Sequence, residues 1–261
     1  MRDNSIYTEE MSKSVWDKAF FMDKISTAKC VIDFGCADGA MIQTLAPMFP
    51  SIEFFGYDID DDMIRRAREV SAYDGSINVS FWDNSKLQLM VQSIKKLYKP
   101  DEICLNFSSV LHEVFSFKDF DAIHYIIKEL NPKYITIRDM YYHEDPDAAP
   151  LYFTFVVDLL QEMKVDKKYI TEFEDKFGPI LTPKQYLHFL MKYQWIENGW
   201  EEELKENYFS WDIETFRATF GYQYYVIYEN HYTLPYLTEK WHSYFFRPDW
   251  QTHAQFILVR F

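Results

Sequence analysis

The residues best suited to chemistry lie in a glycine turn near the start of the chain. Residues 31–46, VIDFGCADGAMIQTLA, are typical of a short apolar strand, a glycine turn and the first turns of a helix. Asp33 and Asp38 stand close to Gly35 and Gly39. Because glycine lets the backbone approach a ligand closely, the stretch predicts a site for a nucleotide-like cofactor. The alternative is a purely structural turn.

A second acid follows at the spacing that a nucleotide site requires. Asp58 closes an apolar run over residues 52–60, about twenty residues beyond the turn, where a carboxylate can accept hydrogen bonds from both ribose hydroxyls. Ile59 would pack on the adenine. A NAD site needs such an acid too, so Asp58 alone does not choose the cofactor. The dinucleotide fingerprint, however, has a glycine where Ala37 stands.

Alternating strands and helices must position these residues. The expected helices between the strands cover residues 40–46, 61–72 and 119–130. The expected strands cover residues 31–34, 52–60, 77–83, 102–110 and 134–140. Such alternation implies parallel pairing with right-handed crossovers, and it places ligands at the carboxyl edge of the sheet.

The pattern changes after the fifth expected strand. Residues 143–208 are predicted to be helical and rich in aromatic side chains, and they are followed by a helix over 213–221 and strands over 222–234 and 253–261. Residues 11–25 have apolar side chains at helical spacing. This N-terminal helix either packs on the sheet or covers the cofactor through Tyr7, Lys13 and Trp16. The expected divisions are 1–142 and 209–261 for an α/β core and 143–208 for an insertion.

The chain resembles the class I S-adenosylmethionine-dependent methyltransferases over residues 31–140 and 211–261. The motif Asp33-Phe34-Gly35-Cys36-Ala37-Asp38-Gly39 carries the resemblance, with Ala37 in place of the commonest glycine. The closing helix–strand–strand order is also similar to the family, in which the last strand inserts antiparallel. The resemblance implies an α/β fold, a Rossmann-like seven-stranded sheet with helices on both faces and a helical insertion after the fifth strand. It also implies S-adenosylmethionine as cofactor.

By resemblance, Asp33 and Asp38 orient the loop and the cofactor amino group, and Asp83 recognises the adenine amine. Asn84 would support that contact, whereas Trp82 either covers the ring or faces the core. The complete set of cofactor residues that the resemblance implies is Asp33, Gly35, Cys36, Ala37, Asp38, Gly39, Asp58, Ile59, Trp82, Asp83, Asn84 and Ser108.

Residues 106–117, NFSSVLHEVFSF, resemble the small-x-x-Leu-His-His stretch of family members that act on small molecules or tRNA. They do not resemble the Asn/Asp-Pro-Pro-Tyr motif of amino-methylating DNA enzymes. Methyl transfer needs alignment above all, and a general base only where the nucleophile must lose a proton. The candidates for that base are His112, Glu113 and His143. No metal ligand set is expected.

The amino-acid composition restricts the class of molecule that could accept the methyl group. The net charge of −14 argues against a broad nucleic-acid surface. The main hypothesis is therefore methylation of a small or medium polar molecule. There are three alternatives. The first is a tRNA or RNA methyltransferase in which residues 192–195 (KYQW) hold a nucleotide. The others are a non-catalytic cofactor-binding subunit and a NAD-dependent oxidoreductase.

The cellular setting is also constrained. No apolar run is long enough for a bilayer, the start lacks a signal-peptide core, and three cysteines form no CxxC pair. A cytoplasmic protein without a membrane partner is expected. The 20 Tyr, 23 Phe and 7 Trp crowd into the second half and could also form a homodimer interface.

Overall fold

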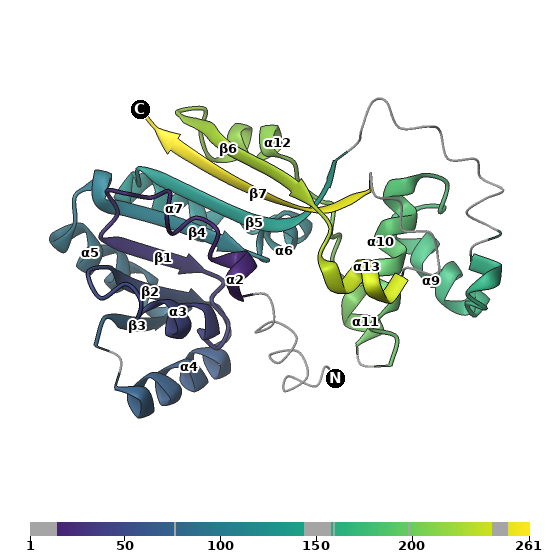
Figure 1. Ribbon diagram of the computed structural model, residues 1–261, viewed down its shortest axis with the longest axis horizontal. Coiled ribbons are helices and arrows are strands. Elements are labelled where there is room, and N and C mark those ends of the chain that lie inside the picture. Colours follow the sequence, from purple (N-terminus) through teal and green to yellow (C-terminus); the bar gives the residue numbers. More distant parts are fainter. Residues whose placement is uncertain (1–14, 76, 144–157, 159, 198, 242–249) are drawn as a thin grey trace.

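The computed structural model describes residues 15–75, 77–143, 158, 160–197, 199–241 and 250–261 (Figure 1). Its strands form one seven-stranded sheet in the order β3-β2-β1-β4-β5-β7-β6. Their bounds are Cys30–Phe34 (β1), Glu53–Asp58 (β2), Val79–Asp83 (β3), Ile103–Ser108 (β4), Tyr134–His143 (β5), Tyr224–Tyr232 (β6) and Gln251–Arg260 (β7). Strands β1 to β5 pair in parallel, and β7 runs antiparallel between β5 and β6. The predicted fold class, including the antiparallel last strand, is confirmed.

Helices cover both faces of the sheet. Every residue of β1 and β4 is buried, which is typical of parallel strands enclosed on two sides. One face packs against α2 (Val15–Lys18), α3 (Ala40–Leu45) and α4 (Asp61–Asp74). The other packs against α5 (Leu87–Leu97), α6 (Leu111–Phe117), α7 (Asp121–Leu130) and α12 (Ile213–Phe220). The sheet is therefore the rigid platform on which the loops at its carboxyl edge are held.

A helical unit follows β5 and lies beyond the carboxyl edge of the sheet (Figure 1). It contains α9 (Lys167–Phe177), α10 (Pro183–Tyr193) and α11 (Trp200–Glu203), and α13 (Pro235–Trp241) joins it from the β6–β7 connection. Thr182 caps α10, with Pro183 in the first turn. The apolar core of the unit includes Leu237 and Trp250, so it draws on two separate parts of the chain.

The sequence prediction was wrong for residues 19–25 of the N-terminal helix and missed three other helices, while residues 11–14 lie outside the described part of the chain. The helix α2 ends at Lys18, and residues 19–24 form turns. Phe21 and Ile25 are buried against the α3 face, so their apolar spacing reflects burial in turns rather than one continuous helix. Tyr7 and Lys13 lie outside the described residues. The helices α5, α6 and α13 were not predicted.

Among the described residues, no helix has the length and apolar character needed to cross a membrane.

Candidate functional site

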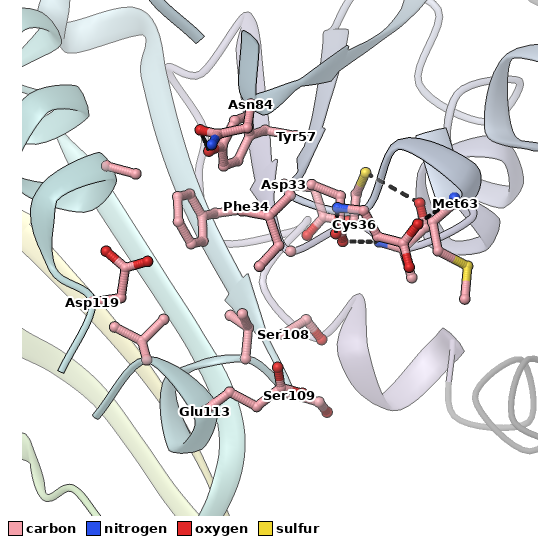
Figure 2. Close-up of a pocket in the computed structure, with 18 of the residues that line it drawn as sticks. Asp33, Phe34, Cys36, Tyr57, Met63, Asn84, Ser108, Ser109, Glu113 and Asp119 are labelled. Carbon is pink, nitrogen blue, oxygen red and sulfur yellow. Dashed lines mark hydrogen bonds between the residues drawn. The ribbon is translucent and has the colours of Figure 1, made fainter. Parts of the chain in front are cut away.

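A cavity of about 830 Å³ opens at the carboxyl edge of the sheet (Figure 2). Its wall comes from the loop after β1, the end of β2, the start of the segment after β3, the end of β4 and Glu206 of the helical unit. Parallel strands end at the same edge, which is why residues far apart in sequence meet there. The volume lies within the range of about 300–1,000 Å³ that is usual for small-molecule sites.

The glycine loop is shaped to present its backbone to this cavity. Gly35 has φ 75° and Ala37 has φ 48°, both in the left-handed region. An L-residue there costs about 1–2 kcal/mol, so this backbone conformation would favour glycine over Ala37. The Ala37 N–H donates to Asp58 Oδ2 at 2.8 Å, and the Asp60 N–H donates to Asp58 Oδ1 at 2.9 Å. Asp58 thus holds the loop as well as ending β2 at the cavity.

Two buried charged groups line the cavity beside the loop. Asp33 accepts a hydrogen bond from Asn106 Nδ2 at 2.8 Å, and burial raises the pKa of its carboxyl to about 7 in spite of that bond. Burial, together with the charge of Arg138, lowers the pKa of the Lys18 ammonium to about 8. Asp17 places Lys18 here, because its carboxylate lies 2.6 Å from Arg138 Nε on β5. This corner offers an anion and a cation to a zwitterionic ligand.

Most residues implied for the cofactor do lie at the cavity. Gly39 does not line it and instead lies under Phe81, whose Cε1 would be 2.4 Å from an added Cβ. The residues that line it are Asp33, Gly35, Cys36, Ala37, Asp38, Asp58, Ile59, Asn84 and Ser108.

Asp83 and Trp82 are turned away from the cavity lining. The Asp83 carboxylate lies 3.0 Å from Arg68 NH2 and 3.2 Å from Lys86 Nζ. A hydrogen bond from the Ser85 hydroxyl, together with these two cations, holds the pKa of Asp83 well below its usual value. The Trp82 Nε1–H donates to Ser80, and the ring packs against the core, which was one of its two expected positions. The structure therefore does not bring Asp83 to the place expected for the adenine amine.

His112 is buried behind the cavity wall and is tied to a buried carboxylate. Its Nδ1 lies 2.7 Å from Asp139 Oδ1, while Asp139 Oδ2 accepts the backbone N–H groups of Val110 and Leu111. Burial lowers the pKa of His112, but the carboxylates of Asp139 and Glu206 outweigh it and raise that pKa to about 10. At neutral pH the ring is therefore an imidazolium, which cannot act as the general base.

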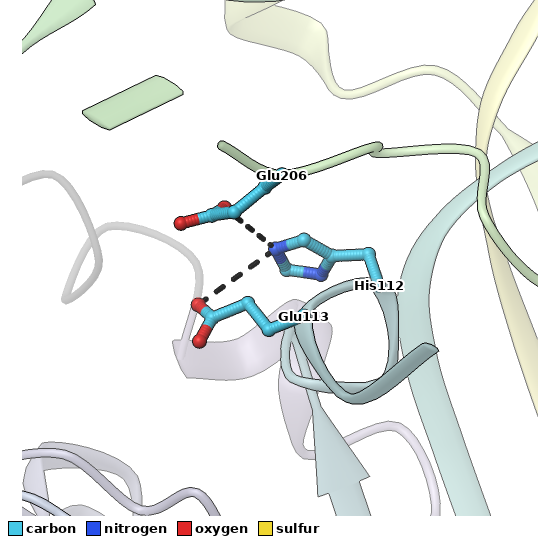
Figure 3. Close-up of side chains that lie close together, drawn as sticks. All are labelled: His112, Glu113 and Glu206. Atoms are coloured by element: carbon cyan, nitrogen blue, oxygen red, sulfur yellow. Dashed lines mark ion pairs between the residues drawn. The ribbon is translucent and has the colours of Figure 1, made fainter. Parts of the chain in front are cut away.

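Two further carboxylates face the same ring. Nε2 of His112 lies 3.6 Å from Glu206 Oε2 and 3.9 Å from Glu113 Oε1 (Figure 3). Glu113 and Glu206 line the cavity, whereas His112 does not. Glu113, the acid that follows His112 on α6, can therefore reach a bound molecule, whereas the His112 ring cannot.

Comparison with known proteins agrees with this architecture. Residues 25–141 match a family model described as a methyltransferase domain. Those residues carry the glycine loop, the acid that ends β2 and the strand β4 that leads to His112. Residues 25–141 therefore carry a methyltransferase domain. The cofactor that the sequence resemblance implies for this domain is S-adenosylmethionine.

Solved structures resemble the chain only distantly. The PH0226 protein from Pyrococcus horikoshii OT3 is 13% identical, with TM-score 0.49 over 95% of this chain and 91% of its own. A SAM-dependent methyltransferase from Aquifex aeolicus is 17% identical, with TM-score 0.38 over 56% and 78%. The N-terminal domain of EvdMO1 with SAH bound is 12% identical, with TM-score 0.45 over 95% and 80%. These similarities are too low to bear on the reaction. No curated protein matches the chain in sequence.

The residues of the methyltransferase domain fit this cofactor. The left-handed loop brings the backbone to the cavity, Asp58 ends β2 beside it, and the buried hydroxyl of Ser108 lines it with no hydrogen-bond partner among the described residues. Such an orphaned polar atom at a cavity wall is suited to a ligand contact.

The remaining catalytic candidate lies elsewhere. His143 ends β5 in an exposed position, its ring stacks on His231 with centroids 4.3 Å apart, and it does not line the cavity. The sequence analysis also missed Lys18, Asp139 and Glu206. Asp139 carried a signal, since the adjacent Arg138 and Asp139 are two charged residues inside a largely apolar strand. Glu206 carried none, because only the folding of the helical unit brings it to the cavity.

Proposed function

We propose that the chain transfers the methyl group of S-adenosylmethionine to a small or medium polar acceptor. The observation that carries this proposal is the single cavity that continues from the glycine loop to Glu113 and Glu206. A cofactor held by the loop would share that cavity with a second small molecule. A site of this size, with aromatic and carboxylate walls, suits one bound acceptor better than a polymer.

The chain's own residues would bind, orient and, where needed, take a proton. When bound, the cofactor supplies a sulfonium methyl group that an aligned nucleophile displaces. We assign Asp58 to the ribose of the cofactor, and Asp33 and Lys18 to its amino acid end. The backbone of the glycine loop would lie directly against the bound cofactor. Glu113 is the better candidate for a general base, because His112 is already protonated and His143 is distant from the cavity.

We propose the helical unit as the acceptor-side cap. Support comes from three contacts with the core. Glu206 lines the cavity with its Oε2 3.6 Å from His112 Nε2, the Asn207 N–H donates to the Ser116 hydroxyl at 2.7 Å, and the Asn207 carbonyl lies 3.3 Å from that hydroxyl. In this division residues 1–142 and 209–261 form the α/β core and 143–208 the cap, to which α13 and Trp250 add apolar contacts.

One of the side chains that the RNA alternative requires at the surface is buried. Lys192 is buried in the helical unit, where its ammonium donates to the Glu203 carbonyl and lies 3.7 Å from the centre of the Tyr208 ring. In this arrangement Lys192 cannot contact a phosphate. The net charge of −14 disfavours RNA as well.

Thermal unfolding tests the cofactor half of the proposal. S-Adenosylhomocysteine at a hundred times its dissociation constant should add about 2.7 kcal/mol to the free energy of unfolding. For a chain of this size that corresponds to a melting temperature roughly 5–11 °C higher. NAD at the same concentration should have no effect. A shift with NAD alone would favour the oxidoreductase and contradict the proposal.

Labelled methyl transfer tests the acceptor half. The chain is incubated with methyl-labelled cofactor and a fractionated extract of the source cells, with and without ribonuclease. We expect label in a small product that ribonuclease does not affect. Label in a ribonuclease-sensitive polymer would identify an RNA acceptor, and cofactor binding without transfer in any fraction would favour the non-catalytic subunit.

A further inference from the structure

Three potential metal ligands meet where the cofactor domain contacts the helical unit. The ring Nε2 of His112 and one carboxylate oxygen each of Glu113 and Glu206 all lie within 4.8 Å of one another. His112 and Glu113 are neighbours on α6, whereas Glu206 reaches them from the segment after α11 (Figure 3). Within the described part of the chain, this is the only group of three or more such side chains found at that spacing.

The His112 ring is oriented as a metal ligand is oriented. Its Nδ1 faces Asp139 Oδ1 at 2.7 Å, so Nδ1 carries a proton and Nε2 points to the two glutamates. Asp139 cannot easily turn, because it is fully buried and accepts the N–H groups of Val110 and Leu111. Metal-binding histidines nearly always donate their other ring N–H to such a carboxylate or carbonyl, which fixes the tautomer and raises the basicity of the ligand.

The surroundings of the three side chains also favour a ligand in the cavity. Ser108 lines the same cavity as Glu113 and Glu206, and its hydroxyl is buried with no hydrogen-bond partner among the described residues. The charge of the wall points to a cation, since concentrated negative charge in a cleft attracts positive ligands. Carboxylates dominate the charged side chains of the described lining, in which the only cationic side chain is Lys18. They belong to Asp33, Asp38, Asp58, Asp60, Glu113, Asp119, Asp121 and Glu206.

We propose that His112, Glu113 and Glu206 bind a divalent first-row metal ion such as Mn²⁺ or Zn²⁺. One imidazole and two carboxylates are an N/O ligand set that suits these ions, whereas a Ca²⁺ site would use more oxygen ligands. Three protein ligands leave coordination positions open, and Glu113 and Glu206 direct them to the cavity. On binding, the ion would replace the proton that His112 Nε2 carries in the metal-free chain, and that proton would be released to solvent. Glu113 would then be a ligand rather than the general base. At the cavity the ion would hold an oxygen atom of the acceptor, a role that rests on the proposed function. The binding of the ion itself does not.

The test measures metal binding rather than activity. The full-length chain is stripped with a chelator and titrated with MnCl₂, with free Mn²⁺ followed by its electron paramagnetic resonance signal, and with ZnCl₂ in a calorimeter. We expect about one ion per chain. Glu206→Gln should weaken binding by more than about 10-fold, because even the loss of a ligand's supporting partner typically costs 10–100-fold. Glu113→Gln should have the same effect.

A matched control comes from α11. Glu201 is exposed and does not line the cavity, so Glu201→Gln should bind the ion as the unmodified chain does. Circular dichroism and S-adenosylhomocysteine binding report whether each variant is folded. An unmodified chain that binds no Mn²⁺ or Zn²⁺ at millimolar concentration overturns the proposal, whatever the variants do. Equal affinity in the unmodified chain and both folded glutamine variants also overturns it. Either result leaves the cofactor-induced thermal shift intact, so failure of the metal site and failure of the proposed function are distinguishable.

Discussion

Replacement of Asp139 by asparagine is the most informative single change to the site. The carboxylate is fully buried and has two duties. Oδ2 accepts the N–H groups of Val110 and Leu111 at 2.9 and 2.5 Å, and so caps α6, whose own N-cap residue Val110 provides no side-chain acceptor. Oδ1 lies 2.7 Å from His112 Nδ1. Asparagine keeps the volume but loses the charge, and its amide N–H₂ must face one of these donors.

The structure gives the size of the effect in the metal-free chain. Burial opposes the charge on His112, but the surrounding carboxylates, Asp139 above all, raise its pKa from 6.5 to about 10. Because a folded-state pKa above the unfolded value stabilises the protonated folded state, this contribution is complete below about pH 6.5 and is lost as the pH rises through 10. Each pKa unit corresponds to 1.36 kcal/mol, so the contribution of His112 to the free energy of unfolding reaches about 5 kcal/mol. This value agrees with the cost of breaking a buried ion pair, which is about 3–5 kcal/mol.

The assay is thermal and urea unfolding of both proteins at two pH values. At pH 6 we expect Asp139→Asn to lower the free energy of unfolding by about 3–5 kcal/mol and the melting temperature by roughly 6–20 °C. At pH 9 the difference should shrink to about 1–2 kcal/mol, since the contribution of His112 is then mostly lost. Asp175→Asn, at an exposed carboxylate, is the control. A difference that is absent at pH 6, or that grows with pH, would refute the assignment of an ionised His112–Asp139 pair.

Three further outcomes are expected. Asp58→Ala should weaken S-adenosylhomocysteine binding about 100-fold or more in calorimetry, and more than His112→Ala does, because two charge-assisted hydrogen bonds are worth roughly 1.5–3 kcal/mol each. Gly39→Ala should lower the melting temperature, because its added Cβ would lie 2.4 Å from Phe81 Cε1 at a φ of 76°; unchanged melting would contradict the packing. Because burial raises the pKa of Asp33 to about 7, cofactor affinity should rise as that carboxyl ionises between roughly pH 6 and 8, and Asp33→Asn should abolish the rise.

The sequence by itself determined the α/β sheet and the cofactor loop. Strand and helix periodicities are local, and a glycine turn after an apolar strand brings its own geometry with it. Gly35, Ala37 and Asp58 were therefore assigned to the right loop and the right strand end, and the structure places all three at the cavity. The fully buried strands β1 and β4 were equally readable, since burial on both faces leaves a mainly hydrophobic run.

Only the tertiary structure decided which acids face the cavity. Asp58 and Asp83 both end a strand, and nothing local distinguishes them. Asp83 is drawn aside because α4 packs so that Arg68 reaches its carboxylate, a contact between residues on different elements. Glu206 joins His112 and Glu113 because the helical unit folds back over α6. The succession of strands and helices along the chain and the chemistry of the loop follow from short-range pattern. The charge pairs that set the chemistry of a site depend instead on distances between elements, which exist only once the chain has packed.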